Sequence, residues 1–444
     1  MTNFDKFYKL ENIPNNWSKT KLKYICSISK ETSTNVSLEN LLSLTQKGIT
    51  KRNTDKNSGQ FAESYENYTL IKKNQICLNP MDLLSGWVDI SNFDGFISPA
   101  YYTLIISKDI NVEFLNYFLQ SNYYRKSFFK KGKGVASHDN YGRWVLSPTD
   151  FNNTTIFIPN NIKDQINICN YLNKKKKKIE LLKNDIDKNI ILRKKYFKLL
   201  INNLTTKGID EKKNLKNFKI SRWNENFPKH WKKIKLKYVV DYFKGFAFKS
   251  NLMQFHGIPI VKASDIKKFT IKKNNNFISK DYKNLYSNVK LLHKDIIIST
   301  VGSHYEVKKS AVGQFGILPK ELEGSFLNQN TISLRIKDDI DVLPEYLFYC
   351  LQGKLFRSHL DYYSHGTANQ SSLDVDDILN FNTLIPDLTE QKKILNYITL
   401  MKDSFDRMEE LSLRQVDLLS KYYKGLVTRI IAGEVKFCKD LECH

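Results

Sequence analysis

The side chains best suited to chemistry in this sequence are basic and hydrogen-bonding groups gathered in three loops. Arginine and lysine recognise guanine, and asparagine and glutamine recognise adenine, when a loop or helix end enters a groove of a nucleic acid. We predict that the lysines contact phosphates, while Asn, Gln and Arg read bases. The candidate DNA-binding residues are Lys130, Lys131, Lys133, Ser137, His138, Asn140, Tyr141 and Arg143 in the first loop, Ser303, His304, Tyr305, Lys308 and Lys309 in the second, and His365, Thr367, Asn369, Gln370 and Ser371 in the third.

The sequence contains no complete catalytic motif. Asn79-Pro80-Met81-Asp82 matches only the first half of the Asn/Asp-Pro-Pro-aromatic motif of adenine methyltransferases, and no glycine-rich strand-turn-helix for a methyl donor accompanies it. Asp387 and Glu390-Gln391-Lys392 imitate the Asp and Glu-x-Lys of a nuclease, but both fall at one predicted helix start, where Asp387 and Glu390 can form a capping box. A phosphate-binding Gly-x-x-x-x-Gly-Lys-Ser/Thr loop is absent. We therefore assign no catalytic residue to this chain.

Composition favours an anionic partner. The chain has 444 residues and a formal net charge of +24, which indicates nucleic acid first and a membrane surface second. The six cysteines form no C-x-x-C pair and the eight histidines show no metal spacing, so we expect neither a disulfide framework nor a metal site. The N-terminus is polar and no apolar run approaches membrane-spanning length, so we expect a cytoplasmic protein that does not enter a membrane.

Two long segments of the chain repeat each other. The segment from Gln165 to Lys198 resembles the segment from Gln391 to Lys424, at a constant offset in residue number (391 − 165 = 424 − 198 = 226). In both segments apolar residues recur mostly every three, four or seven positions, which predicts long amphipathic helices with a narrow seam. Because one such helix cannot bury its seam alone, we expect the two to pack against each other as an antiparallel pair.

The charge of the two predicted helices differs. Residues 160–215 contain 15 basic and 6 acidic residues, whereas residues 387–444 contain 10 of each. The first helix, with its run Lys174 to Lys178, can face a phosphate backbone while the second faces protein or solvent. A solvated lysine surface is the alternative.

A globular block precedes each predicted helix. The first block opens with Trp17 and Leu22-Lys23-Tyr24-Ile25, and the second opens with Trp231 and Leu236-Lys237-Tyr238-Val239 (231 − 17 = 214). Because this offset differs from that of the helical segments, the blocks have loops of different length on a similar scaffold. Gly, Asn and Asp separate short β-rich runs, and a helical pattern follows them, which indicates a mixed α+β domain. The expected elements are strands at 75–78, 101–106, 295–299 and 330–334, and helices at 113–120 and 345–352.

These features together resemble the specificity subunit of type I restriction-modification enzymes, over nearly the whole chain. The residues that carry the resemblance are the block openings at Trp17 and Trp231, the block endings Asp150 to Pro159 and Asp377 to Pro386, the helix start Pro386-x-x-x-Glu390-Gln391, the segment Gly134 to Trp144, and Lys421-Tyr422-Tyr423-Lys424-Gly425-Leu426. The resemblance implies an α+β fold in which two similar mixed α/β target recognition domains are separated by two long antiparallel helices in a pseudo-two-fold arrangement.

The same resemblance implies function and partners. Each domain would bind one half of a bipartite asymmetric sequence in double-stranded DNA, and the helical spacers would dock two methyltransferase subunits. Those would in turn recruit the restriction subunits, and the complex would methylate adenine or cleave DNA. S-adenosylmethionine, ATP and Mg are expected in the partners, with no cofactor in this chain. An approximate two-fold axis suits two half-sites about one helical turn apart.

The expected domain organisation is a first target recognition domain at 1–158, a first helical spacer at 159–208, a linker at 209–226, a second target recognition domain at 227–385, a second helical spacer at 386–435 and a tail at 436–444. Two alternatives remain open. One is a stand-alone DNA methyltransferase or nuclease with fused recognition domains, and the other is a coiled-coil scaffold that reads no sequence.

Replacing Arg143 with alanine tests base reading. If its guanidinium recognises a base, the substitution costs about 1–3 kcal/mol of binding free energy and relaxes one position of the DNA site. Competition binding against duplexes that vary one base pair at a time measures both effects. Equal weakening on every duplex would contradict base reading by this residue.

Overall fold

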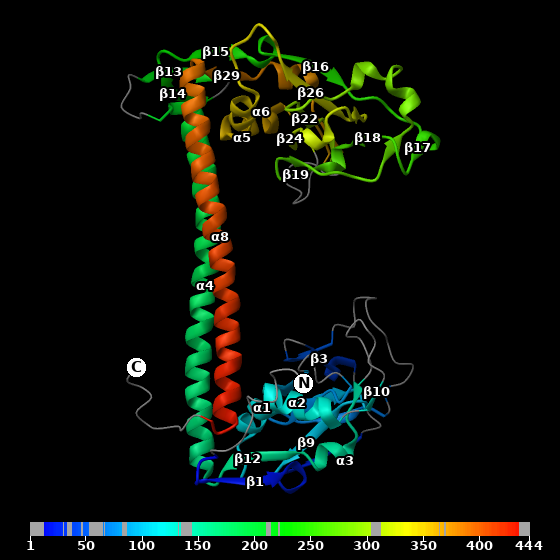
Figure 1. The fold of residues 1–444 in the computed structure, drawn as a ribbon, viewed down its shortest axis with the longest axis vertical. Helices are drawn as coiled ribbons and strands as arrows, with labels where there is room; N and C mark the ends of the chain where they lie inside the picture. Colours follow the sequence, from blue (N-terminus) through cyan, green and yellow to red (C-terminus); the bar gives the residue numbers. More distant parts are fainter. Residues whose placement is uncertain are drawn as a thin grey trace, which may run out of the picture. The chain divides into compact units, whose positions relative to one another are not determined.

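The computed structural model describes residues 13–29, 31–32, 38–45, 48–52, 65, 67–81, 87–131, 133–134, 144–209, 215–220, 223–302, 312–363, 365–367 and 370–434. The chain divides into two compact units, Met1–Asp187 with Ser412–His444 (unit 1) and Lys188–Leu411 (unit 2). Each contains a globular domain, named the first domain in unit 1 and the second domain in unit 2, and parts of the two long helices α4 (Ile162–Lys207) and α8 (Leu388–Ile431) (Figure 1).

The first domain is built on a four-stranded antiparallel sheet of order β2-β9-β6-β7, with two-stranded sheets beside it. Buried side chains of α1 and α2 share the core under this sheet with Leu172 of α4 and Ile430 of α8. The described elements are β1 (Trp17–Lys21), η2 (Leu22–Tyr24), β2 (Cys26–Ile28), η3 (Leu38–Asn40), β3 (Leu42–Thr45), β4 (Gly48–Lys51), β5 (Thr69–Ile71), β6 (Ile76–Leu78), β7 (Val88–Ile90), β8 (Gly95–Ile97), β9 (Tyr102–Ile106), α1 (Val112–Gln120), α2 (Asn122–Lys131), β10 (Lys133–Gly134), β11 (Trp144–Val145), α3 (Pro148–Asn152) and β12 (Thr155–Pro159).

The second domain repeats this plan with the sheet β16-β26-β22-β24 and adds a second four-stranded sheet, β17-β21-β18-β25, with its own apolar core. Its elements are β15 (Lys232–Lys235), η4 (Leu236–Tyr238), β16 (Val240–Lys244), η5 (Ser250–Leu252), β17 (Met253–Gln254), β18 (Ile258–Val261), η6 (Ala263–Asp265), β19 (Ile266–Lys267), β20 (Thr270–Ile271), β21 (Phe277–Ile278), η7 (Lys280–Lys283), η8 (Ser287–Val289), β22 (Ile296–Ser299), β23 (Val301–Gly302), β24 (Phe315–Ile317), η9 (Lys320–Leu322), β25 (Phe326–Leu327), β26 (Thr331–Ile336), α5 (Pro344–Gln352), α6 (Lys354–Tyr363), β27 (His365–Thr367), β28 (Gln370–Ser372), α7 (Val375–Leu379) and β29 (Asn382–Ile385).

Strand pairing shows that the two domains are copies. Cys26 faces Ile106 across β2 and β9, and Val240 faces Ile336 across β16 and β26. Strand β1 pairs with β12 as β15 pairs with β29, so each domain begins beside the strand that ends it. The predicted α+β fold with two similar domains and two long helices is confirmed, and every predicted strand and short helix is present within two residues of its predicted ends.

The long helices extend over Ile162–Lys207 (α4) and Leu388–Ile431 (α8), and in each unit they run antiparallel. In unit 1, Lys183 of α4 donates to Ser420 of α8 over 2.7 Å, and the start of α4 shares a core with the end of α8. In unit 2, Lys194 pairs with Glu409 at 2.6 Å, and the rings of Phe197 and Phe405 lie 5.7 Å apart.

The seam between the helices is narrower than the sequence predicts. Leu182 belongs to the predicted apolar stripe but remains 44% exposed, and Leu192 and Leu400 beside the seam are 59% and 70% exposed. A pair of helices buries only the residues along one line of contact, so apolar residues beside that line stay in solvent where no domain covers them.

The predicted linker at 209–226 contains regular structure. Strands β13 (Leu215–Ile220) and β14 (Trp223–Pro228) form an antiparallel hairpin, with Leu215 facing Pro228 and Ile220 facing Trp223. The role of 209–226 as a linker between the two halves stays a prediction, and this hairpin occupies part of it. The local reason for the hairpin is composition, because Leu, Phe, Ile and Trp recur among the lysines and asparagines and favour strands.

A buried glutamine joins each domain to its long helix. Gln391 donates to the carbonyls of Pro386 and Asp341 at 3.0 and 2.9 Å and accepts from the Leu343 amide at 2.9 Å. Gln165 makes the same three contacts in unit 1, to Pro159, Asp109 and Asn111. Both side chains are at most 1% exposed, so each satisfies backbone groups that water cannot reach.

Side chains of the long helices also cap shorter helices of the two domains. In unit 1 the Asn122 amide at the start of α2 donates to Thr428 of α8 over 3.3 Å. In unit 2 the Lys354 amide at the start of α6 donates to Asn202 of α4 over 3.0 Å. Thr428 and Asn202 are equivalent positions of the helical repeat, since they differ by its constant offset. Each domain therefore rests on the start of one long helix and the end of the other.

Among the described residues, no helix has a stretch of the length and apolarity needed to cross a membrane.

Replacing Gln391 with methionine tests the glutamine clamp. Methionine keeps the approximate volume but leaves buried backbone groups unpaired, at about 1–3 kcal/mol each. We expect the midpoint of thermal unfolding of unit 2 to fall by roughly 5–10 °C. The control is Gln254→Met, because Gln254 lies exposed in β17. Equal midpoints for Gln391→Met and the control would contradict the clamp.

Candidate nucleic-acid interface

A short hairpin bears the first predicted DNA-binding loop. Lys133 faces Val145 and Gly134 faces Trp144 across β10 and β11. Lys130 lies in α2 and Lys133 in β10, but their side chains are not described. The predicted residues Ser137, His138, Asn140, Tyr141 and Arg143 lie outside the described residues, so their DNA contacts remain predictions.

Lys131 has a structural partner. Its ammonium donates to the carbonyl of Asn153 over 3.1 Å and to Thr154 Oγ1 over 3.4 Å, which ties the end of α2 to the turn before β12. Burial lowers the pKa of Lys131, Asp150 counteracts this, and the nearby positive charge of Lys21 lowers the pKa further. The ammonium therefore already has polar partners, and its predicted phosphate contact remains a prediction.

In the second domain the tertiary structure brings two predicted loops together. Strands β23, β28 and β27 form one sheet, in which Gly302 pairs with Ser371 and Gly366 also pairs with Ser371. The chain leaves this sheet after Gly302 towards the predicted residues Ser303, His304, Tyr305, Lys308 and Lys309, which lie outside the described residues. The predicted residues His365, Thr367, Gln370 and Ser371 lie in β27 and β28, without described side chains, and Asn369 is not described.

An equivalent backbone hydrogen bond supports the candidate hairpin in both domains. Leu373 donates its amide to the carbonyl of Thr300 over 2.9 Å, and Leu146 donates to Pro80 over 3.0 Å. Asn79 next to this hydrogen bond accepts from the Met81 amide at 3.0 Å and is 7% exposed. The partial methyltransferase motif at Asn79-Pro80 is thus a turn that positions the strand after the first candidate loop.

His359 is a supporting residue that the sequence did not single out. It is 6% exposed on α6, its Nε2 lies 2.7 Å from the Asp377 carbonyl oxygen, and its ring packs 5.3 Å from that of Phe381. Since a carbonyl only accepts, Nε2 carries the proton. Burial lowers the pKa of His359. The sequence could have indicated His359 through its position on the apolar face of the helix that leads into β27. The histidines predicted from the sequence belong instead to the candidate loops.

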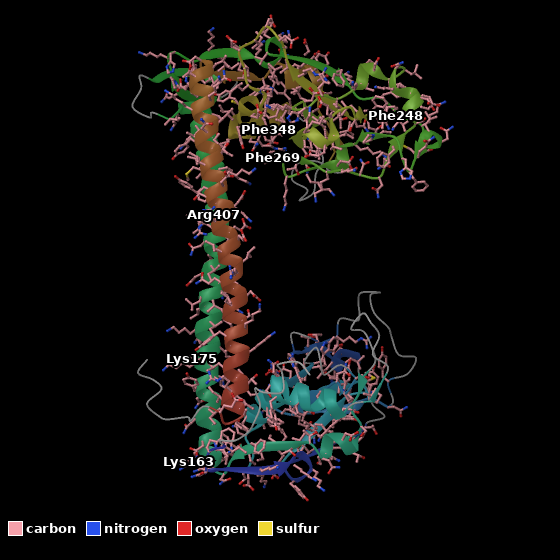
Figure 2. All side chains as sticks on the ribbon, viewed as in Figure 1. Lys163, Lys175, Phe248, Phe269, Phe348 and Arg407 are labelled. Carbon is pink, nitrogen blue, oxygen red and sulfur yellow. The ribbon has the colours of Figure 1, made fainter. Side chains whose placement is uncertain are left out.

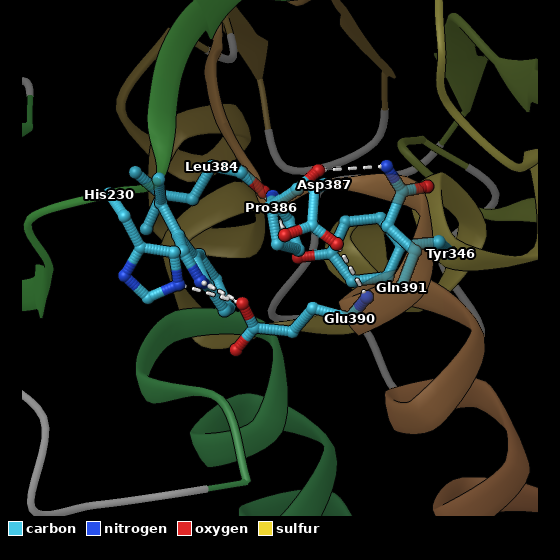
Figure 3. Close-up of polar contacts among 8 residues, drawn as sticks. His230, Tyr346, Leu384, Pro386, Asp387, Glu390 and Gln391 are labelled. Carbon is cyan, nitrogen blue, oxygen red and sulfur yellow. Dashed lines mark hydrogen bonds and ion pairs between the residues drawn. The ribbon is translucent and has the colours of Figure 1, made fainter.

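The start of α8 uses the residues that imitate a nuclease motif for structure. Asp387 accepts from the Glu390 amide at 2.8 Å, so the predicted helix cap is confirmed. The Glu390 carboxylate does not close the predicted capping box. Instead it contacts His230 Nε2 at 2.7 Å (Figure 3). It also accepts from Trp231 Nε1 at 3.2 Å. The residues that open the second domain, at Trp231, therefore bind the Glu390 carboxylate in place of the first backbone amide of α8.

An ion pair between a half-buried arginine and a buried aspartate joins two strands of the second domain. Arg335 donates to both carboxylate oxygens of Asp295, at 2.8 and 2.7 Å, and Asp295 is 2% exposed. Hydrogen bonding to Asp295 raises the pKa of Arg335, against the opposing effect of burial. This pair fixes the start of β22 against β26 and thereby the strand that leads to β23.

No group of three potential metal-ligating side chains occurs in the part of the chain that the structure describes. Cys26, Cys77, Cys169 and Cys350 are free thiols.

The sequence of this chain is similar to known proteins. Residues 228–413 match the family model of the type I restriction modification DNA specificity domain. The type I restriction enzyme MjaVIII specificity subunit of Methanocaldococcus jannaschii is 25% identical over 382 residues, which cover 83% of this chain and 82% of that protein.

Solved structures agree. A structure from work on complex assembly and conformational transition of the type I R-M system superimposes with a TM-score of 0.62 at 13% identity, covering 96% of this chain and 100% of that one. The HsdS subunit from Thermoanaerobacter tengcongensis gives a TM-score of 0.52 at 13% identity, with 96% and 98% covered. The chain shares the fold of these structures, and the resemblance to type I specificity subunits that was drawn from the sequence is confirmed.

The depressed pKa of His359 predicts a pH dependence. The folded state holds this imidazole neutral, so the unfolded state binds the proton more readily once the pH falls below about 6.5, and the free energy of unfolding decreases there. His359→Gln keeps a donor for Asp377 and removes the titration. Urea unfolding at pH 5.5 and 7.5 should show a smaller difference for the variant than for the wild type. An unchanged difference would contradict a neutral, buried His359.

Proposed function

We propose that this chain is the non-catalytic specificity subunit of a type I restriction-modification complex. It binds a bipartite, asymmetric sequence in double-stranded DNA and directs partner subunits that methylate adenine or cleave DNA. The observation that carries the proposal is the repeated hairpin. β10–β11 and β27–β28 occupy equivalent places in two copies of one domain, each supported by the same backbone hydrogen bond from the strand end.

The two copies carry unlike loops on this shared base. In the first domain nine residues, 135–143, separate β10 from β11, whereas two residues separate β27 from β28. In the second domain β23 adds the end of another loop to the same sheet. Recognition of base edges depends on the side chains at such positions, so unlike loops read unlike half-sites. The asymmetry of the DNA sequence follows from this difference.

The long helices supply surfaces for the methyltransferase partners. Large apolar side chains stay exposed on both, and clustered exposed apolar residues mark sites of protein association. In unit 1 these are Leu181, Leu182, Leu413, Leu418 and Tyr422, and in unit 2 they are Ile191, Leu192, Tyr196, Leu199, Tyr397, Leu400, Met408 and Leu411. A repeated chain with two such surfaces suits two methyltransferase subunits, through which the restriction subunits join.

S-adenosylmethionine, ATP and Mg then belong to those partners, which act in the cytoplasm. The catalytic motifs of methyl transfer and ATP hydrolysis are incomplete or absent in this sequence. The residues that best imitate them have structural partners instead, as Asn79 and Glu390 do.

Co-expression with the cognate methyltransferase tests the proposal. Mapping of methylated adenines across a genome should reveal one interrupted, asymmetric motif that disappears when this chain is omitted. The purified chain alone should not methylate DNA. Methylation by the chain alone would instead indicate a stand-alone enzyme, and equal binding of random and selected DNA would indicate a scaffold without sequence reading.

A further inference from the structure

Both domains open with the same basic segment, whose lysines are exposed except for the half-buried Lys233. In the first domain Lys19 and Lys21 lie on β1, followed by Lys23 and Tyr24 in η2. In the second domain the equivalent residues, at the offset of the two tryptophans, are Lys233 and Lys235 on β15, followed by Lys237 and Tyr238 in η4. Alternate residues of a strand share one face, so each domain presents a pair of lysines on its opening strand.

The fold explains only the leucine in each Leu-Lys-Tyr turn. Leu22 and Leu236 are fully buried in the cores of their domains. Tyr24 and Tyr238 are 69% and 59% exposed. Each ring lies beside the preceding lysine, with the ammonium 5.0 Å from the Tyr24 centroid and 5.3 Å from the Tyr238 centroid. The same exposed Lys–Tyr pair thus occurs twice without contributing to either core.

Apart from Lys233, which has a partner of its own, the lysines of these segments are not neutralised within the described part of the protein. Among the described residues, Lys19, Lys21, Lys23 and Lys237 form no ion pair, and the polar partner of Lys235 is the neutral Asn380 at 3.4 Å. Their charges are therefore available to an anionic partner.

In the first domain the basic segment is continuous with the candidate recognition hairpin. The Leu22 amide donates to the Thr154 carbonyl over 2.9 Å, and the Lys131 ammonium donates to the hydroxyl of the same threonine. Lys131 ends α2, two residues before β10 begins at Lys133. The positive charge of Lys21 lies close enough to lower the pKa of the Lys131 ammonium.

The second domain makes the corresponding connection through aromatic packing. The Leu236 amide donates to the Phe381 carbonyl over 2.8 Å. Phe381 packs against Phe356 and His359 of α6, with ring centroids 4.9 and 5.3 Å apart. Helix α6 leads into β27, so here too the opening strand is fastened to the element that carries the hairpin.

We propose that β1–η2 and β15–η4 hold the phosphate backbone of double-stranded DNA beside each half-site. The lysine ammonium groups pair with phosphate oxygens, and the hydroxyls of Tyr24 and Tyr238 donate to the same backbone. Such contacts fix the position of a domain on the duplex and carry no sequence information. The inference rests on the proposed function, since it adds a positioning surface to the same DNA complex.

The test uses the full chain in complex with its methyltransferase. The variants are Lys19→Gln with Lys21→Gln and Lys23→Gln for the first domain, and Lys235→Gln with Lys237→Gln for the second. The conservative pair Tyr24→Phe and Tyr238→Phe removes only the hydroxyls. The matched control is Lys280→Gln with Lys283→Gln, because these lysines are exposed in another 3-10 helix, η7. The probes are a duplex with the mapped site and a random duplex of equal length.

Affinity is measured between 50 and 200 mM salt. Removal of each phosphate contact should reduce the slope of log affinity against log salt by about 0.9, so the slope of the first-domain variant should fall by about 2.7 if all three lysines contact phosphate. Affinity for both duplexes should fall by the same factor, and the methylated motif should stay unchanged. The tyrosine variants should weaken both duplexes equally and leave the slope unchanged.

Three outcomes overturn the inference. They are slopes that match the wild type, a control that lowers the slope as much as the variants, and dissociation of the methyltransferase from the complex while the slope stays the same. The last would assign the segment to protein docking. Failure of the proposed function is seen separately, because the wild-type complex would then show no preference for the mapped site.

Discussion

A buried glutamine in the first turn of each long helix is the contact on which both domains depend. Gln165 and Gln391 each join the end of the last strand of a domain to the turn that precedes its first helix, by bonding backbone groups sealed from water. A buried amide that loses its partner costs more than the bond itself contributes, so this geometry tolerates little displacement. The glutamine therefore ties the last strand of each domain to the start of its long helix.

The helices do more than separate the domains, since each domain core includes residues from both. Leu172 of α4 and Ile430 of α8 are buried in the core of unit 1, and Leu204 of α4 and Ile394 of α8 share a core in unit 2. Thr428 and Asn202 make equivalent caps on α2 and α6 from opposite helices. A substitution in a helix end is therefore expected to affect the domain that it supports as well as any partner on its surface.

The second domain shows where the copies have diverged while the scaffold stayed the same. Phe269 occupies a two-residue hairpin turn with a positive φ of 65°, a strained conformation for a bulky residue. Its ring contacts Phe315 at 5.1 Å and Phe348 at 6.4 Å, and Figure 2 shows Phe269 beside Phe348. Aromatic packing of this kind compensates for the strain. Together with the Arg335–Asp295 pair, it stabilises the sheet next to the candidate loops.

The sequence determined the elements whose signals are local and repeated. The constant offset between the two helical segments and their apolar spacing predict both long helices, and β-rich runs predict β6, β9, β22 and β26, because periodicity depends on which face of an element is buried. The fold class and the resemblance followed from these signals. The candidate DNA-binding residues were chosen by type alone, and only the Lys131 side chain lies among the described ones.

Only the tertiary structure decided which distant segments meet. It joined the loops after Gly302 and around Gln370 in one sheet, directed Glu390 to Trp231 rather than into a capping box, and placed Thr428 and Asn202 on the neighbouring domains. These contacts link positions far apart in the chain. Which residues meet depends on how the elements pack and on which backbone groups this packing removes from water. Local residue patterns contain no record of that choice.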